Sequence, residues 1–255
     1  MSDVRICAVD PSSTPGVILD QIEPVSRVLA VLAHPDDVDF GAAGSVAKWV
    51  SAGTEVIYCL VTDGDAGGFD PTIPRDQMPS IRQFEQAAAG KIVGVNQLEF
   101  LGYKDGELEV TTALRRDISR VIRRYRPDRV LCQSPERNYA RIFSSHPDHL
   151  AAGEATLSAV YPDSRNPFTF VELIEEGLEA HSVKDVLLMA FPEPDCFEDV
   201  TGTFDKKLEA ILAHASQHPD PSRIEPMVRG WLQAVAASAG LAKGSLAEAF
   251  KLVRT

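Results

Sequence analysis

An alternation of strand-like and helical patterns between residues 27 and 133 constrains the fold more than any other feature of the sequence. Val28–Ala33 is rich in residues that favour strands, and Glu55–Thr62 is a second apolar run of strand length. Between them, Ala43–Ser51 carries apolar side chains at helical spacing. Two parallel strands joined by a helix form a βαβ unit, so the sequence predicts an α/β domain.

The same alternation continues towards the C-terminus. We expect further helices at Pro79–Val93, Thr112–Tyr125, Ala151–Val160, Asp205–Ser216 and Arg229–Phe250, and further strands at Leu98–Leu101, Arg129–Gln133 and Val186–Ala190. This order predicts a Rossmann-like, doubly wound, mainly parallel sheet with helices on both faces. Such folds bind ligands at the carboxyl ends of their strands, so the residues that follow each strand are the candidates for function.

Length and composition predict a single domain. A chain of 255 residues with 44% hydrophobic content can bury a large core, and we expect this core in residues 27–255. Residues 1–26 contain prolines and little periodicity, which is typical of an extension that lies over the domain. Such an extension could cover a pocket or support a homo-oligomer, and the sequence leaves both open.

The formal net charge of −12 excludes two classes of partner. It would repel phosphate backbones and anionic lipids, so we expect neither nucleic acid nor a membrane surface as a partner, and a small neutral or cationic molecule as the substrate. The four cysteines form no CxxC pair, no apolar run reaches the roughly 20 residues of a membrane span, and the N-terminus lacks a signal-peptide pattern. These features predict a cytoplasmic protein.

The first candidate site follows the first strand. His34 stands where the strand ends, Pro35 forces a turn, and Asp36 and Asp37 come next. His34 and Asp37 are three residues apart and can face a common point, while Asp36 can project nearby without being a ligand. One carboxylate can therefore bind a metal ion while the other acts as an acid or base.

The second candidate site is the segment His146-Pro147-Asp148-His149. Pro147 suits the first turn of a helix, and His146 and His149 would lie on one face of that turn. Either cluster alone is also explained as a helix cap or a structural histidine. Together they predict a His-Asp-His set with an open fourth position, which is typical of a catalytic zinc site, although iron or cobalt can also occupy such nitrogen and oxygen ligands.

Other polar features carry less information. Thr62–Gly68 follows a strand and either lines the site or is a plain glycine-rich turn, and it lacks the Lys-Ser/Thr of a phosphate-binding P-loop. His181, His214 and His218 have no ligand partner at close spacing, so we interpret them as structural.

Ala33–Asp37 and His146–His149 resemble the motifs of the zinc-dependent N-acetylglucosaminyl deacetylases of the PIG-L/LmbE family. The resemblance covers most of the chain in order, apart from the N-terminal extension and the C-terminal end. It includes four further segments, which are Thr62–Gly67, Arg82–Val95, Phe100–Gly106 and His214–Gln217.

The resemblance implies roles for eight residues. The residues implied to hold zinc are His34, Asp37 and His149. The residues implied in catalysis are Asp36 as the general base, His146 as the group that supports the tetrahedral intermediate and protonates the departing amine, and Asp148, which would orient His146. Arg82 and Asp105 match residues that hold sugar hydroxyls. The chain departs from the family pattern at Val38, where the first motif usually has Glu, and at Ser144, where some sugar-thiol members have Tyr.

Three functions are compatible with these residues. The favoured one is removal of an N-acetyl or other N-acyl group from an amino sugar or N-acetylglucosamine conjugate, and an amidase of a sugar-thiol conjugate differs from it only in the acyl group. A metallophosphoesterase would use Asp63 and Asp65 to bind a second metal ion about 3.5–4 Å from the first. A non-catalytic sugar-binding protein would need neither Asp36 nor His146.

Overall fold

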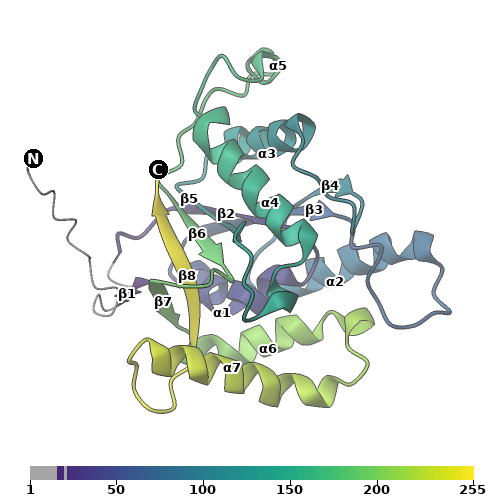
Figure 1. Cartoon of the computed structure of the whole chain (residues 1–255), viewed down its shortest axis with the longest axis vertical. Coiled ribbons are helices and arrows are strands. Elements are labelled where there is room, and N and C mark those ends of the chain that lie inside the picture. The colour runs from purple at the N-terminus through teal and green to yellow at the C-terminus, as the bar shows by residue number, and fades with distance from the viewer. Residues whose placement is uncertain (1–15, 20–21) are drawn as a thin grey trace, which may run out of the picture.

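A computed structural model describes residues 16–19 and 22–255, and an eight-stranded sheet forms its centre (Figure 1). The strands are β1 Val17–Ile18, β2 Arg27–Leu32, β3 Glu55–Thr62, β4 Gln97–Tyr103, β5 Arg129–Gln133, β6 Asp185–Met189, β7 Cys196–Asp199 and β8 Ala247–Arg254. Their order across the sheet is β1-β7-β8-β6-β5-β2-β3-β4. Pairings between the described strands are parallel except at β8, which runs antiparallel to β6 and β7. The predicted mainly parallel α/β fold is therefore confirmed.

Helices cover both faces of this sheet (Figure 1). The helices are α1 Asp37–Ser51, α2 Met78–Val93, α3 Thr112–Tyr125, α4 Pro147–Ser158, α5 Val171–Glu175, α6 Phe204–Leu212 and α7 Ile224–Ser238. Short helical turns occupy Arg75–Gln77, Ile142–Ser144, Ala159–Asp163, Thr201–Thr203, Ala215–Gln217 and Pro221–Arg223. One hydrophobic core joins the sheet to α1, α2 and α6, and a second joins it to α3 and α4. Helix α7 packs outside α6 through a smaller cluster.

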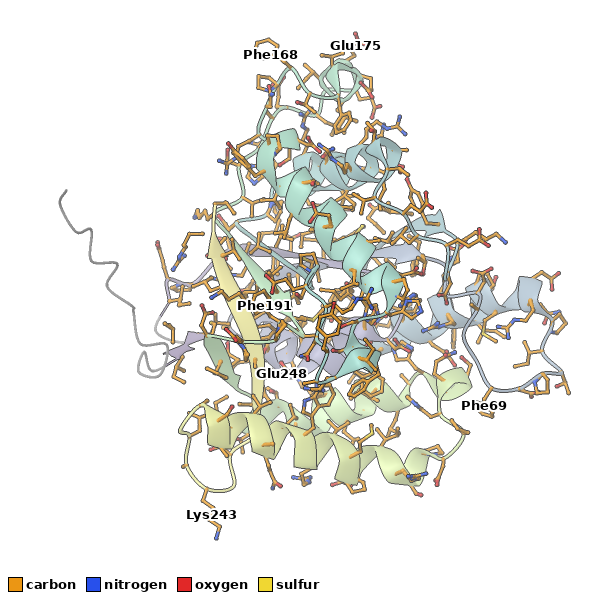
Figure 2. All side chains as sticks on the ribbon, viewed as in Figure 1. Phe69, Phe168, Glu175, Phe191, Lys243 and Glu248 are labelled. Atoms are coloured by element: carbon orange, nitrogen blue, oxygen red, sulfur yellow. The ribbon has the colours of Figure 1, made fainter. Side chains whose placement is uncertain are left out.

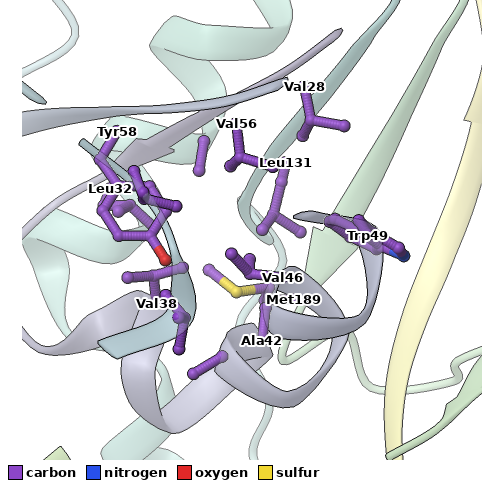
Figure 3. Packing of buried hydrophobic residues seen from close by; sticks show 14 of the residues in the cluster. Val28, Leu32, Val38, Ala42, Val46, Trp49, Val56, Tyr58, Leu131 and Met189 are labelled. Carbon is purple, nitrogen blue, oxygen red and sulfur yellow. The ribbon is translucent and has the colours of Figure 1, made fainter. Parts of the chain in front are cut away.

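Strand β2 is apolar along its whole length because both of its faces are buried. Val28 and Leu32 belong to the core on the α1 side, and Leu29 and Val31 belong to the core on the other side. Figure 3 shows side chains of α1, including Val46, packed beneath this part of the sheet. The continuous apolar run that precedes His34 is therefore a central parallel strand.

The direction of winding reverses between β2 and β5. From β2 the chain proceeds through α1 to β3 and through α2 to β4, and it then returns through α3 to β5 on the opposite side of β2. The segments that leave the carboxyl ends of β2 and β5 consequently diverge. A crevice at such a switch point is the usual place for a ligand in a doubly wound fold.

Helix α1 begins earlier than the sequence predicted, at Asp37 rather than at residue 43. Its first turn alternates acidic and apolar residues, which is not the spacing of an apolar helix face. Helix α4 begins at Pro147, the residue that the second cluster predicted for the first turn of a helix, although the predicted apolar range began only at residue 151. Gly153 lets α4 pack closely, because a Cβ atom there would collide with the carbonyl oxygen of Gln133 at the end of β5.

The prediction for the C-terminal region was partly wrong. Helix α7 ends at Ser238 rather than at Phe250, and the left-handed Gly240 and Gly244 lead into β8, which the sequence placed in a helix. Strand β7 was also missed. Alanine, leucine and lysine in β8 favour helices, but pairing with two neighbouring strands overrides that weak local preference.

A buried ion pair ties β8 to α1. The Glu248 carboxylate accepts hydrogen bonds from Gly44 N and Ser45 N at 3.0 and 2.8 Å, and Lys207 Nζ lies 2.7 Å from it. Lys207 also donates to the Phe40 carbonyl at 2.7 Å. Both charged side chains are almost fully buried, so the bonds compensate for the lost hydration of both charges. Figure 2 labels Glu248 on the ribbon of β8.

The periphery includes part of the predicted N-terminal extension. Val17–Ile18 forms β1 and pairs with β7, whereas residues 1–15, 20 and 21 lie outside the described residues. At another edge, the segment around α5 extends away from the sheet and carries the exposed Phe168 (Figure 2). None of the helices in the described part of the chain combines the length and the apolar character that a membrane crossing requires.

Candidate metal centre and active site

The two predicted clusters meet at the switch point. His34 follows β2, and His146 and His149 lie at the start of α4, after β5. The ring centroids of His34 and His146 are 4.9 Å apart, and those of His34 and His149 are 5.2 Å apart. Residues more than a hundred positions apart thus form one site because their strands are parallel neighbours.

Each of two histidines has one ring nitrogen anchored and the other directed into the site. His34 Nε2 lies 3.1 Å from the Asp148 carboxylate and 3.0 Å from that of Asp105, and carboxylates only accept, so Nε2 carries the proton. His149 Nδ1 lies 3.4 Å from the carbonyl oxygen of Ser144, which likewise only accepts. The lone pairs of the neutral rings therefore lie on His34 Nδ1 and His149 Nε2.

These two nitrogens and Asp37 form a triangle of donor atoms. His34 Nδ1 and His149 Nε2 are 3.2 Å apart, His149 Nε2 is 2.9 Å from Asp37 Oδ1, and His34 Nδ1 is 3.5 Å from Asp37 Oδ2. Ligands about 2.0–2.1 Å from a tetrahedral zinc ion lie about 3.3 Å from one another. The residues fit such an ion, and His34, Asp37 and His149 form a group that could hold a metal ion.

His34, Asp105 and His146 form a second such group. It would use His34 Nε2, which already faces Asp148, and the Asp148 carboxylate is fixed by Gly106 N at 2.7 Å and Leu108 N at 3.3 Å. A hydrogen bond of this kind orients a metal-binding histidine from behind. We therefore favour the group with Asp37 and His149.

Asp37 is oriented by a residue that the sequence analysis did not identify. Asp37 Oδ2 accepts from the backbone nitrogen of His34 and from Gln133 Nε2, both at 2.6 Å, which leaves Oδ1, 2.9 Å from His149 Nε2, free to face the metal position. Gln133 ends β5, and its other amide atom accepts from Ala33 N at 3.2 Å. A polar residue at the carboxyl end of a buried strand was the only signal for it.

Asp36 lies beside this triangle in a strained conformation. Its φ of 92° is in the left-handed region, which is uncommon for a residue other than glycine. Two contacts hold it, because Gln86 Oε1 accepts from Asp36 N at 2.8 Å and Arg82 Nη2 lies 2.9 Å from its carboxylate. Burial raises the pKa of Asp36 to about 6, although the positive charge of Arg82 opposes the shift.

Gln86 links Asp36 to Asp39, the acid that follows Val38 in the sequence. Its amide nitrogen donates to Asp39 Oδ2 at 2.9 Å, and His214 Nε2 lies 2.8 Å from the same oxygen. Asp39 and His214 are fully buried. His214 thus holds Asp39 by a hydrogen bond and has no contact with the triangle of donor atoms.

Asp148 has a different partner from the one that the resemblance implied. The Asp148 carboxylate contacts His34. Asp148 contacts His146 only through its backbone nitrogen, which donates to His146 Nδ1 at 3.2 Å. His146 caps α4 and remains partly exposed. Burial lowers the pKa of His146, and the neighbouring charge of His34 lowers it further.

Arg82 and Asp105 lie in the site but are engaged with protein groups. Arg82 is 3% exposed and, besides Asp36, donates to the carbonyl oxygens of Pro35 and of Gly64. Asp105 contacts His34 and lies 3.9 Å from Arg82. Any hydroxyl group that they bind would therefore share these groups with Asp36 and His34.

Electrostatics favour a cation in the triangle. Burial disfavours a protonated His34, but its hydrogen bonds to Asp105, Asp148 and Asp37 outweigh burial and raise the pKa of His34 to about 12. Asp37 and its bond likewise raise the pKa of His149 against the effect of burial. Protons on the His34 and His149 rings offset the negative charge of the neighbouring carboxylates, as the positive charge of a bound metal ion would.

A pocket of about 370 Å³ opens above these residues. Its lining residues are His34, Asp36, Asp37, Ala66, Gly67, Arg82, Asp105, Phe143, His146, His149 and Gln217. Of the segment Thr62–Gly68, Ala66 and Gly67 line the pocket. Gln217 belongs to the segment His214–Gln217, which the resemblance included, whereas the sequence analysis missed Phe143, because an exposed aromatic ring carries no local signal of function.

The fold and the site show an α/β protein with a candidate metal centre at the switch point of its sheet. Comparisons with known proteins then identify the family. The PIG-L family model, described as GlcNAc-PI de-N-acetylase, matches residues 29–160. A diacetylchitobiose deacetylase of Thermococcus kodakarensis is 33% identical over 80% of this chain and 74% of its own length. A probable N-acetyl-alpha-D-glucosaminyl L-malate deacetylase 2 of Bacillus anthracis is 31% identical over 75% of this chain and 81% of its own.

A solved structure agrees with these relatives. The N,N'-diacetylchitobiose deacetylase from Pyrococcus horikoshii, complexed with an inhibitor, superposes with a TM-score of 0.83 at 28% identity, over 92% of this chain and 85% of that one. The chain belongs to the PIG-L family, which confirms the resemblance found in the sequence.

Proposed function

We propose that this protein is a zinc-dependent hydrolase that removes the N-acetyl group from an N-acetylglucosamine-containing small molecule. The observation that carries the proposal is the triangle of donor atoms with the Asp36 carboxylate beside it. Relatives named as deacetylases of diacetylchitobiose and of N-acetylglucosaminyl malate support the reaction and the class of substrate. In this proposal residues 27–255 act as one domain.

His34, Asp37 and His149 would hold the zinc ion. When bound there, zinc supplies Lewis-acid chemistry, since it polarises a carbonyl group and lowers the pKa of a water molecule to about 7. Three protein ligands leave a fourth position for water or substrate, as in other catalytic zinc sites. His34 is held through Nε2 and His149 through Nδ1. Their other ring nitrogens, His34 Nδ1 and His149 Nε2, therefore face the metal position.

Asp36 would act as the general base. It accepts the proton of the attacking water while the water oxygen forms a bond to the carbonyl carbon of the N-acetyl group. A base works best when its pKa lies near the working pH, and burial moves the pKa of Asp36 in that direction. Arg82 contacts the Asp36 carboxylate and Gln86 holds the Asp36 backbone nitrogen, and both contacts limit the loss of entropy on reaction.

His146 would complete the reaction. When the C–N bond breaks, the nitrogen leaves as an amine after it accepts a proton, and the products are acetate and the free amino sugar. His146 lies on the pocket wall next to His34 and is the histidine outside the triangle, so it can donate this proton and a hydrogen bond to the oxyanion. Asp148 would support the reaction indirectly by orienting His34.

Arg82 and Asp105 would take part in substrate binding. Both residues line the pocket, so the Arg82 guanidinium and the Asp105 carboxylate are candidates to bind sugar hydroxyls. The two-metal phosphoesterase gains no support, since neither Asp63 nor Asp65 belongs to a metal-binding group among residues 16–19 and 22–255.

The decisive experiment measures metal content and acetate release together. The purified protein would be tested with a small panel of N-acetylglucosamine conjugates, with and without a chelator. We expect one zinc ion per chain and acetate release that the chelator abolishes and added zinc restores. A bound metal ion without acetate from any of the sugars, or two metal ions per chain, would overturn the proposal.

A further inference from the structure

The backbone nitrogen of Asp36 is held by the side chain of Gln86. Asp36 stands before α1 with φ of 92° and ψ of −24°, a conformation that a residue other than glycine adopts at a cost. Its carbonyl oxygen accepts bonds from Asp39 N and Phe40 N in the first turn of α1, at 2.9 and 3.1 Å. Its N–H donates instead to another element, because Gln86 Oε1 of α2 lies 2.8 Å away. This bond therefore helps to keep Asp36 in its strained conformation.

The amide group of Gln86 has two possible directions. Its oxygen and nitrogen have nearly the same shape, so packing alone does not decide which of them faces Asp36 N. Gln86 Nε2 donates to Asp39 Oδ2 at 2.9 Å. Because a carboxylate only accepts and a backbone nitrogen only donates, Asp39 fixes the amide with its oxygen towards Asp36. The opposite direction would place two donors together at Asp36 and two acceptors together at Asp39.

His214 holds Asp39 from a third element. It follows α6, and its Nε2 lies 2.8 Å from the same Asp39 Oδ2. The side chains of Asp39, Gln86 and His214 are all fully buried. A chain of hydrogen bonds, shielded from water, therefore connects His214 through Asp39 and Gln86 to Asp36.

Support of the core alone does not explain why these side chains are polar. Apolar residues of similar size would fill the same space, and such replacement of a buried ion pair is often neutral or stabilising. An apolar set could not accept the hydrogen bond from Asp36 N, however. The chain of bonds ends on that nitrogen, in the residue that carries the proposed base.

We propose that Asp39 and His214 are positioning residues for the general base. His214 holds Asp39, Asp39 fixes the direction of the Gln86 amide, and the amide oxygen holds Asp36 in its left-handed conformation. The inference rests on the proposed deacetylase function, because it concerns the residue that accepts the proton of the attacking water. Neither Asp39 nor His214 lines the pocket or belongs to the donor triangle.

The test reverses the polarity of the bond between Gln86 and Asp39. Gln86→Glu keeps an oxygen for Asp36 N but places an acceptor against the Asp39 carboxylate. Acetate release would be measured for the zinc-loaded enzyme, with the sugar of the panel that the wild type hydrolyses fastest. We expect kcat to fall about 10- to 100-fold with KM and zinc content unchanged, because a small displacement of a reacting group has effects of that size.

Asp39→Asn in the same chain should repair this loss. It supplies a donor in place of the acceptor, and the net charge of the double variant equals that of the wild type. His214 Nε2 can then accept once its proton moves to Nδ1, which has no hydrogen-bond partner among residues 16–19 and 22–255. We expect kcat of the double variant to return to within about fivefold of the wild type.

Two single variants complete the comparison. Asp39→Asn alone should lower kcat less than about fivefold, because its oxygen can still accept from Gln86 and His214. Gln77→Glu is the matched control, since it makes the same change at the exposed start of α2, and it should leave kcat unaltered. A double variant as slow as Gln86→Glu, or a Gln86→Glu enzyme as fast as the wild type, would overturn the positioning role.

Gln86→Met replaces Gln86→Glu if that variant does not fold. It keeps the length of the side chain without an amide group, so it should show the same loss of kcat. Asp39→Asn should not repair this loss, and a repair would overturn the inference.

Crystal structures of the same variants test the positioning role without turnover. Asp36 should leave the left-handed region in Gln86→Glu and return to it in the double variant. An unchanged φ of Asp36 in Gln86→Glu would overturn the positioning role and leave the deacetylase function in place. If the wild type releases no acetate from any sugar, the proposed function fails, and the φ of Asp36 still decides whether Asp39 and His214 position that residue.

Discussion

The connections that leave β2 and β5 contribute to one site but differ in construction. The first is short and buried, and it holds Asp36 in a left-handed conformation between Arg82 and Gln86. The second is longer, and it exposes Phe143 before it enters α4. The proposed base lies on the short connection, whereas the long one carries the proposed acid, His146, after an exposed surface that can differ between related enzymes.

The largest effect should come from the donor triangle, to which both connections contribute. Asp37→Ala removes a donor after β2, and His149→Ala removes one after β5, so each should lose the metal ion and all measurable acetate release. Metal analysis of the purified variants checks this. Asp65→Ala is the control, because Asp65 stands outside both metal-binding groups and should keep one metal ion per chain. Full metal content in both ligand variants would remove these residues as ligands.

The next effect separates chemistry from metal binding. Asp36→Asn on the first connection and His146→Ala on the second should each lower kcat about 10²- to 10⁴-fold while the metal ion stays bound, because a positioned base or acid contributes about that much. Turnover, metal content and thermal melting should be measured on the same samples. If both variants turn over like the wild type, the assignment of base and acid is wrong.

A smaller effect should arise where the two connections touch. Gln133→Ala removes the amide that holds Asp37 Oδ2, and loss of such a supporting bond typically weakens metal affinity about 10- to 100-fold. Competition with a chelator of known affinity gives the change. Gln97→Ala, an exposed glutamine bonded to Tyr125, provides the comparison and should leave the affinity unaltered. Equal metal affinities in the wild type and both variants would show that metal binding by Asp37 does not depend on the hydrogen bond from Gln133.

The smallest effect should come from the long connection itself. Asn138→Ala removes the acceptor for two backbone nitrogens, each worth about 0.5–1.5 kcal/mol, so the loop should become less ordered. We expect KM for the acetylated sugar to rise about three- to tenfold with kcat and metal content almost unchanged. A fall in kcat without a change in KM would mean that the loop serves the chemistry and would remove the contrast between the connections.

Sequence patterns were most informative in the centre of the sheet. β2, β3 and β5 are buried on both faces, so their composition reflects one environment and their bounds could be predicted closely. β7 and β8 form the edge region, where pairing between distant segments decides the conformation, and both were missed as strands. The clusters around His34 and His149 could be found because each follows a predicted strand.

The contacts that orient these clusters were not predictable from spacing. Asp148 lies two residues from His146 in the chain, yet its carboxylate contacts His34, 114 positions away. The orientation of His34, and hence the nitrogen that faces the metal position, depends on this contact. The roles of Gln86 and Gln133 were not predictable from spacing either, because they follow from the packing of α2 against α1 and from the pairing of β5 with β2.

The bond between Glu248 and α1 has a consequence for the order of events during synthesis. Helix α1 carries Asp37 at its first turn, and its Gly44 and Ser45 need an acceptor that belongs to β8. A nascent chain that has not yet emerged as far as β8 would contain every metal-binding residue, but Lys207 would be buried without its counter-charge. Helix α1 should therefore hold Asp37 in its final position only after β8 has joined the sheet, although β8 contributes no residue to the triangle of donor atoms.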